Sequence, residues 1–180
     1  TLGTGVGGGI IIDGKIYTGF NFCGAEIGHT VIEYNGRPCS CGRKGCFEAY
    51  ASATALINFT KEAMLDNPDS KLWEIAGGID GVDGKTAFDG MRAGDEAGKK
   101  VVDEYIKYLG YGLTSFVNIF QPEVLCIGGG VSKEGETILA PLREIVRRDS
   151  YGADKVENTR VVVAELGNDA GIIGAALVEY

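Results

Sequence analysis

One histidine and three cysteines stand close together in the sequence and could bind a metal ion. The stretch "GHTVIEYNGRPCSCGRKGCFE" (28–48) holds the only histidine of the chain and three of its five cysteines: His29, Cys39, Cys41 and Cys46. Three thiolates and one imidazole complete a tetrahedral shell for zinc, and a shell of four protein ligands is typical of a structural site. Cys39 and Cys41 are too close in sequence to pair comfortably, whereas both can reach one ion. We therefore predict a structural zinc ion that holds the loop 35–47 rigid.

Two other interpretations of this cluster stay open. The thiols could be free beside a histidine on a loop, or the segment could be a zinc module that reads nucleic acid. The net charge of −8 argues against a nucleic acid and against an anionic membrane surface as partner. Gly42 and Gly45 let the backbone curl around an ion at no steric cost. Cys23 and Cys126 lie outside the cluster, and we expect both to be small buried hydrophobic residues.

Two carboxylates flank the cluster. Glu26 precedes His29 by three residues, and Glu48 follows Cys46 by two. Carboxylates beside an imidazole suit a ligand rich in hydroxyls, because each carboxylate can accept two or more hydroxyl hydrogen bonds. Glu48 could equally be a favourable negative charge in the first turn of the following helix.

Two glycine-rich turns have the composition of phosphate- or nucleotide-binding turns. "LGTGVGGG" (2–9) offers glycines for close backbone approach and a threonine hydroxyl, but it lacks the lysine of a P-loop. "IGGGVS" (127–132) follows a predicted strand, the position at which open α/β sheets bind ligands. Each turn is a weak signal alone, and the two reinforce each other.

The composition is that of one soluble globular domain over residues 1–180. The chain is 44% hydrophobic and 23% charged, with 29 glycines. It has no apolar run of membrane-spanning length and no charged-then-apolar leader, so we expect a cytoplasmic protein. The odd cysteine count argues against a disulfide framework. Because the chain starts at Thr1 in the middle of a strand pattern, we expect it to be the C-terminal part of a longer protein.

The hydrophobic pattern predicts an α/β domain. Apolar residues at helical spacing form one continuous stripe within 95–120, and Pro122 ends that helix. Asp13-Gly14 predicts a tight hairpin turn. We expect two strands within 7–19, one at 29–34, a buried one within 123–132 and one at 160–166. We expect helices at 47–65, 95–120, 134–149 and 168–180, the last capped by Asn168 or Asp169. The segment 67–84 should be irregular.

Together these segments resemble the ROK family of bacterial sugar kinases, open reading frames and repressors, over essentially the whole chain. "TLGTGVGGGIIIDGKI" resembles the family's second phosphate motif, "GAEIGH" its sugar-contact motif and "CSCGRKGCFE" its zinc motif. "IGGGVS" resembles the adenosine segment and "LGNDAGIIGAAL" the closing helix. The run "GRPCSCGRKGCFEAYAS" is particularly similar to the glucokinase branch.

The resemblance implies an actin-like ATPase (ribonuclease H-like) fold, with a hairpin-led mixed sheet flanked by helices and a small zinc loop. The chain would be the C-terminal lobe of a two-lobe sugar kinase, without its N-terminal lobe. The implied roles are hydrogen bonds to sugar hydroxyls from Glu26, His29 and Glu48, contact with the β- and γ-phosphates from Gly3, Thr4 and Gly5, and an adenosine pocket lined by Gly128, Gly129 and Gly130. His29 would use one ring nitrogen for zinc and the other for the sugar.

The family's first phosphate motif and its catalytic aspartate have no counterpart in this chain. Asn168-Asp169 resembles the family's Asn-Asp pair only superficially and is better interpreted as a helix cap. We therefore expect an ATP- and Mg²⁺-dependent hexose kinase, with glucose as substrate, whose C-terminal lobe is inactive alone. A homodimer is expected from the family. The rival interpretations are the sugar-sensing domain of a ROK-type repressor and a purely structural zinc module.

Overall fold

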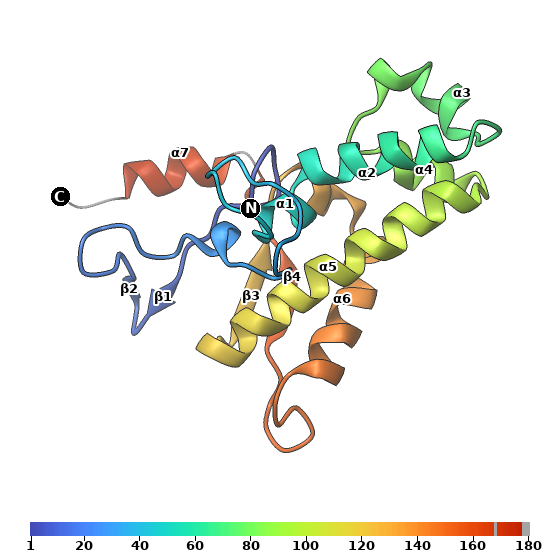
Figure 1. Cartoon of the computed structure of the whole chain (residues 1–180). Coiled ribbons are helices and arrows are strands. Elements are labelled where there is room, and N and C mark those ends of the chain that lie inside the picture. The colour runs from blue at the N-terminus through green and yellow to red at the C-terminus, as the bar shows by residue number, and fades with distance from the viewer. Residues whose placement is uncertain (168, 178–180) are drawn as a thin grey trace.

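The computed structural model describes residues 1–167 and 169–177 of the chain. This part is mixed α/β, with short strands and longer helices (Figure 1). The strands are β1 (Ile11–Ile12), β2 (Lys15–Ile16), β3 (Val124–Ile127) and β4 (Arg160–Val163). The helices are α1 (Glu48–Ala51), α2 (Ala53–Asp66), α3 (Leu72–Ala76), α4 (Thr86–Arg92), α5 (Glu96–Phe120), α6 (Glu136–Asp149) and α7 (Asp169–Ala176), with 3-10 helices η1 (Ile27–His29), η2 (Ile79–Gly81) and η3 (Gly130–Glu134).

The long helix α5 is the scaffold of the domain and crosses the molecule diagonally in Figure 1. Helices α2, α4 and α6 all pack against it. The predicted apolar stripe is confirmed, and of its eight residues only Phe120, at the C-terminal end, is exposed (40%). The other seven are buried: Val102, Tyr105, Ile106, Leu109, Leu113, Phe116 and Val117. The Asp95 carboxylate caps the helix by accepting the N–H of Gly98. At the other end, Gln121 adopts a left-handed conformation with φ +40°, and Pro122 follows it.

The predicted helix 47–65 is two helices, so that expectation is wrong at Ser52. This residue has an extended backbone (φ −78°, ψ 164°) between α1 and α2. Its side-chain oxygen accepts the backbone N–H of Ala55 at 3.0 Å. Serine competes with helix continuation by making such local bonds, which favour a helix start over a helix interior. The chain therefore turns at Ser52 and presents the N-terminus of α2 to the first residues of the sequence.

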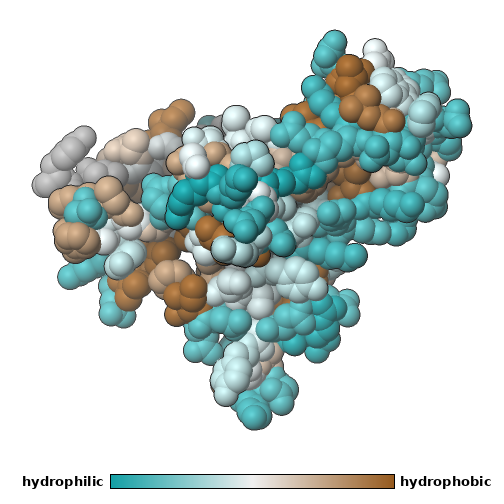
Figure 2. All heavy atoms as spheres, viewed as in Figure 1, coloured by the Kyte–Doolittle hydropathy of each residue, from teal (hydrophilic) through white to brown (hydrophobic). Residues whose placement is uncertain are grey.

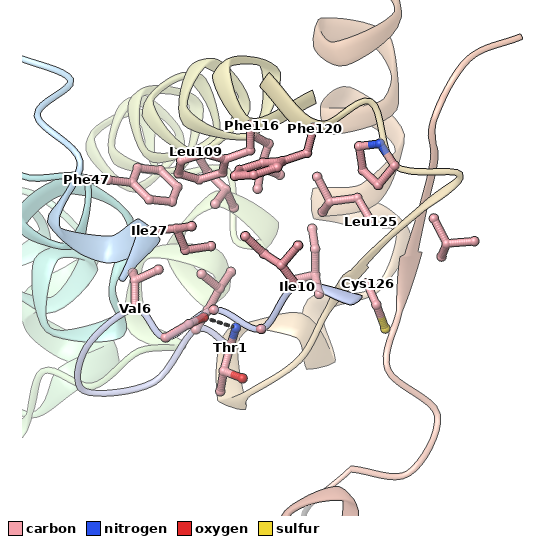
Figure 3. Close-up of a pocket in the computed structure, with 18 of the residues that line it drawn as sticks. Thr1, Val6, Ile10, Ile27, Phe47, Leu109, Phe116, Phe120, Leu125 and Cys126 are labelled. Carbon is pink, nitrogen blue, oxygen red and sulfur yellow. Dashed lines mark hydrogen bonds between the residues drawn. The ribbon is translucent and has the colours of Figure 1, made fainter. Parts of the chain in front are cut away.

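Within the described residues the strands form two separate two-stranded sheets, where we predicted a hairpin-led mixed sheet. β1 and β2 pair antiparallel, and the predicted turn is confirmed by the positive φ of Asp13 (51°) and Gly14 (74°). β3 and β4 pair parallel. An apolar cleft of about 450 Å³ is lined by residues 7–11 on one side and by β3 on the other (Figure 3).

The predicted strand at 29–34 is also wrong. The helix η1 ends at His29, and Val31 makes only an isolated bridge with Cys46. The backbone N–H groups of Ile32 and Glu33 both donate to one acceptor, the carbonyl of Gly45. This segment therefore folds onto the cysteine loop, and it pairs with none of the strands in the described part of the chain.

Several residues are more exposed than the sequence predicted. The predicted buried strand β3 is only partly covered, because its first and third residues are exposed. Cys23 and Cys126 are exposed, so the expectation that both are buried is wrong. Cys23 follows the exposed β1–β2 hairpin, and Cys126 is the third residue of β3.

The closing helix is confirmed as α7, but none of its residues is buried. Asn168, one of the two predicted caps, lies outside the described residues. In Figure 2 hydrophobic residues gather on the left of the molecule, over the hairpin and α7. No helix in the described ranges has the length and apolar character needed to cross a bilayer.

Candidate functional site

The first seven residues form a tight turn, which we call the turn 1–7. Thr1 and Gly7 exchange two hydrogen bonds, from the amino group of Thr1 to the carbonyl of Gly7 (2.9 Å, Figure 3) and from the N–H of Gly7 back to the carbonyl of Thr1 (3.2 Å). Leu2 and Val6 form an antiparallel bridge one step further in. Residues 3–5 are therefore the tip of the turn, where the sequence predicted contact with phosphates.

The second glycine turn lies against the turn 1–7. The backbone N–H of Leu2 donates to the carbonyl of Gly128 at 2.7 Å. Gly129 has φ +95°, and a Cβ at this position would lie 2.3 Å from the Leu2 carbonyl oxygen. Only glycine allows this approach, so the two turns that were weak signals in the sequence are in direct contact.

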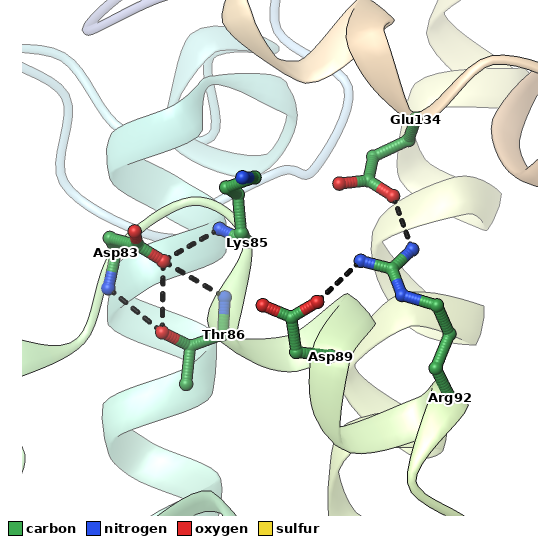
Figure 4. Close-up of polar contacts among 6 residues, drawn as sticks. All are labelled: Asp83, Lys85, Thr86, Asp89, Arg92 and Glu134. Atoms are coloured by element: carbon green, nitrogen blue, oxygen red, sulfur yellow. Dashed lines mark hydrogen bonds and ion pairs between the residues drawn. The ribbon is translucent and has the colours of Figure 1, made fainter. Parts of the chain in front are cut away.

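Polar contacts fix the segment that follows this glycine turn. Arg92 on α4 forms ion pairs with Asp89 and with Glu134 at the end of η3, each at 2.6 Å (Figure 4). At the start of α4, one Asp83 oxygen accepts the backbone N–H groups of Lys85 and Thr86. Helix α4 thus ties η3 to the helical layer.

Glu48 connects the turn 1–7 to the cysteine loop. Its Oε2 accepts the backbone N–H of Val6 at 3.0 Å, and its Oε1 accepts the hydroxyl of Ser40 at 3.0 Å. A Cβ added at Gly5 would lie only 2.4 Å from this Oε2 atom, so the carboxylate packs closely against the turn. The adjoining hollow, of about 480 Å³, includes Thr4 and Thr54 in its walls.

The histidine and the three cysteines of the predicted metal site come together. One ligand atom from each of His29, Cys39, Cys41 and Cys46 lies within 4.8 Å of the others. His29 Nδ1 is 3.7 Å from Cys39 Sγ, and the Sγ atoms of Cys41 and Cys46 are 3.6 Å apart. A tetrahedral ion with Zn–S bonds of about 2.3 Å holds its sulfurs roughly 3.8 Å apart, so the donor set fits zinc.

Two glycines shape this loop as the sequence predicted. Gly42 and Gly45 have φ of +85° and +77°. A Cβ on Gly45 would lie 1.7 Å from the Glu33 carbonyl oxygen, whereas one on Gly42 would meet nothing within 4 Å. Gly45 is therefore required for close packing as well as for its backbone conformation.

The thiols of the cluster have different electrostatic environments. Hydrogen bonds from the Arg43 backbone and guanidinium lower the pKa of the exposed Cys41 thiol to about 6. Burial raises the pKa of the Cys46 thiol to about 12. The Arg43 guanidinium also donates to the His29 carbonyl at 2.8 Å. A bound cation favours the thiolate form of both cysteines, because only thiolates are ligands.

Of the two other predicted sugar-contact residues, His29 lies in the cluster and Glu26 lies outside it. His29 turns Nδ1 towards the thiols, which leaves Nε2 for another partner. Its neighbour Gly28 packs so tightly on the turn 1–7 that a Cβ would lie 2.1 Å from the Val6 carbonyl oxygen. Glu26 lies just before η1 and is exposed, and within the described residues it makes none of these contacts.

Other residues that hold the site were missed from the sequence. The hydroxyl of Ser40 donates to Glu48, and the hydroxyl of Thr54 donates to the Thr4 carbonyl. The Tyr50 hydroxyl accepts the backbone N–H of Arg37 at 2.6 Å. The Arg37 guanidinium forms two hydrogen bonds of 2.6 Å to Glu62 and lies 4.5 Å from the centre of the Phe59 ring. The hydrogen-bonded partners lie 8 to 50 residues apart in sequence, and no regular spacing pairs them.

Two glycine turns, a carboxylate and a cysteine–histidine loop on an α/β scaffold define the class of protein. The chain belongs to the ROK family, whose sequence pattern it matches over residues 1–179. It is 42% identical over 178 residues to a glucokinase of Thermotoga maritima, covering 99% of this chain and 56% of that protein. It is 32% identical to a xylose repressor of Caldicellulosiruptor bescii, covering 97% of this chain and 43% of the repressor.

A solved structure shows the same fold. The ROK family glucokinase of Streptomyces griseus, in complex with glucose and AMPPNP, superposes with a TM-score of 0.88 at 38% identity, covering 97% of this chain and 57% of that one. The expected family and the actin-like ATPase fold of its sugar kinases are thereby confirmed. The chain spans a little over half the length of these glucokinases.

Proposed function

We propose that the chain is the C-terminal lobe of a two-lobe, ATP-dependent hexose kinase that uses glucose. The observation that carries this proposal is the position of the turn 1–7. It contacts Gly128 on one side and Glu48 on the other, so a nucleotide at the first and a sugar at the second would meet at its tip. The similarity to glucokinases, 42% against 32% for the xylose repressor, supports a kinase over a repressor.

The sugar site in this proposal consists of Glu26, His29 and Glu48. Glu48 Oε2 accepts one hydrogen bond, from the Val6 N–H, and has a second lone pair for a sugar hydroxyl. Oε1 accepts the Ser40 hydroxyl and lies 3.8 Å from Cys39 Sγ. His29 offers Nε2, because Nδ1 faces the thiols. The nucleotide is held by Gly3, Thr4 and Gly5 at its phosphates and by Gly128, Gly129 and Gly130 at its adenosine.

A zinc ion bound by His29, Cys39, Cys41 and Cys46 has a structural role. Such an ion would fix the His29 ring and the loop that carries Ser40. Rigid placement of these groups matters because phosphoryl transfer depends on alignment of the acceptor hydroxyl with the γ-phosphate.

The mechanism assigned to this lobe is positioning and charge neutralisation. Backbone N–H groups at the tip of the turn 1–7 would face the charge that develops on the transferred phosphoryl group, and Mg²⁺ bound with ATP would supply further positive charge there. Glu48 and His29 orient the sugar 6-hydroxyl. The aspartate that removes the proton of this hydroxyl belongs to the preceding lobe, so this lobe alone transfers no phosphate.

The two alternative functions differ from a kinase in the ligands that they would bind. A ROK repressor domain would bind sugar without needing ATP, and a structural zinc module would bind neither. We would measure the thermal unfolding midpoint of the full-length protein with glucose, with AMPPNP and with both. A ligand that binds only the folded state raises this midpoint. The proposal predicts a rise with each ligand; a rise with glucose alone favours the repressor, and no rise with either favours the zinc module.

A further inference from the structure

We propose that Thr54 is a positioning residue for the nucleotide phosphates, acting through the backbone of the turn 1–7. The inference rests on the proposed function and extends it to a residue on α2. Thr54 would touch no reacting atom in this role. Its hydroxyl would fix the direction in which one backbone N–H group of the turn, that of Gly5, points, beside the Thr4 N–H that the Ala53 backbone directs.

The first step is the contact between the turn and the start of α2. The backbone N–H of Ala53 donates to the carbonyl of Gly3 at 2.8 Å. The hydroxyl of Thr54 donates to the carbonyl of Thr4, also at 2.8 Å. Two successive carbonyls at the tip of the turn are thus drawn towards the N-terminus of α2.

The second step follows from the planarity of the peptide bond. In a trans peptide the carbonyl and the next N–H point in opposite directions within one plane. Fixing the carbonyl of Gly3 therefore directs the N–H of Thr4 away from α2, and fixing the carbonyl of Thr4 does the same for the N–H of Gly5. Within the described residues, neither N–H donates a hydrogen bond. Two unused donors that both point away from α2, on a tip where Thr4 is exposed and Gly5 half-buried, are suited to phosphate oxygens.

The third step is the rigidity of the support. The side chain of Ser52 caps α2 by accepting the N–H of Ala55, which fixes the first turn of the helix that carries Thr54. The next N–H along the turn, that of Val6, is already bound by Glu48. Thr54 and Glu48 therefore hold adjacent peptides of the turn, and the peptide N–H groups left for a ligand are those of Thr4 and Gly5.

The test compares nucleotides with and without the β- and γ-phosphates. We would measure the affinity of the full-length protein for AMPPNP and for AMP by calorimetry, in wild type, Thr54→Val and Thr54→Ser. Thr54→Val keeps the side-chain shape and removes the hydroxyl. We expect it to weaken AMPPNP binding about two- to tenfold, the effect of one lost hydrogen bond, and to leave AMP binding unchanged. Thr54→Ser keeps the hydroxyl and should bind AMPPNP like wild type.

The matched control is Thr114→Val. The Thr114 hydroxyl is buried on α5 and has no hydrogen-bond partner in the described part of the chain, so this variant should bind both nucleotides like wild type. If Thr54→Val folds poorly, Thr54→Ala is the second variant without a hydroxyl. The inference about Thr54 is overturned, and the proposed function is not, if Thr54→Val binds AMPPNP as tightly as wild type. The same holds if Thr54→Val weakens AMP and AMPPNP binding equally. Failure of the wild type to bind AMPPNP overturns the proposed function together with it.

Discussion

The Glu48 carboxylate accepts the backbone N–H of Val6 at 3.0 Å across 42 residues of sequence. This bond joins the first turn of α1, which the sequence linked to sugar recognition, to the turn that it linked to phosphates. The same carboxylate holds Ser40 of the cysteine loop. Glu48 is therefore shared by three segments of the site, and replacing it should affect more than one of them.

Two substitutions of Glu48 should separate these roles. Glu48→Gln keeps an oxygen for the Val6 N–H and loses the charge, so we expect the KM for glucose to rise about tenfold or more with little change in the KM for ATP. Glu48→Ala removes both contacts and should raise both constants. Steady-state kinetics of the full-length protein would show this difference. Equal losses for both substrates in Glu48→Gln would mean that Glu48 only supports the fold.

The metal site should hold one zinc ion per chain. Cys46→Ser replaces a buried ligand, and we expect the zinc content to fall well below one and the free energy of unfolding to decrease. Cys23→Ser changes an exposed cysteine outside the cluster and is the control. Metal analysis with thermal unfolding would test both variants. A wild-type protein that folds normally with substoichiometric zinc would contradict the assignment.

Two glycines of the cysteine loop provide a matched pair. Both have positive φ, so alanine at either position costs about 1–2 kcal/mol of backbone strain. Gly42→Ala should show little more than this cost, because its Cβ meets nothing within 4 Å. Gly45→Ala would place a Cβ 1.7 Å from the Glu33 carbonyl oxygen and should also lose zinc. Denaturant unfolding and metal analysis would test the contrast, and similar behaviour of the two variants would count against the loop geometry.

Much of the fold was predictable because local patterns determine it. The stripe of α5, from Val102 to Val117, follows from helical spacing alone, and Asp13-Gly14 follows from turn chemistry. The strand predicted at 29–34 failed because the backbone N–H groups of Ile32 and Glu33 both donate to the Gly45 carbonyl, a tertiary contact that overrides local propensity. Ser52 carried a readable capping signal, which the apolar spacing on either side concealed.

The candidate site was predicted in its parts and not in its connections. His29 and the three cysteines were found because their types and spacing are specific to metal sites. The contact of Leu2 with Gly128 and that of Thr54 with Thr4 depend on how distant segments pack, and a single sequence holds no record of such pairs.

Asp95 should make stability depend on pH at the acid end. Burial alone would raise the pKa of its carboxyl, but hydrogen bonds from Gly98, Lys71 and Ser70 outweigh burial and lower it. The stabilisation is therefore complete above the ordinary aspartate pKa of about 3.9 and is lost as the pH falls through the lower folded value. Asp95→Ala should cost about 1–3 kcal/mol at pH 7.

This difference between wild type and Asp95→Ala should shrink as the pH falls below about 4. Asp69→Ala, at an exposed position, should change the free energy of unfolding by no more than about 0.5 kcal/mol and serves as the control. Denaturant unfolding between pH 2.5 and 7 would test both variants. A difference that is constant over this range would contradict the role of the charged carboxylate.

The central claim is that this lobe binds sugar and ATP for phosphoryl transfer, and ADP release tests it most directly. The full-length, zinc-replete protein would be assayed with ATP, Mg²⁺ and each of glucose, mannose, N-acetylmannosamine, N-acetylglucosamine and allose. We predict sugar-dependent ADP release that is fastest with glucose. Absence of sugar-dependent ADP release with all five sugars would contradict the kinase assignment and favour the sugar-sensing repressor.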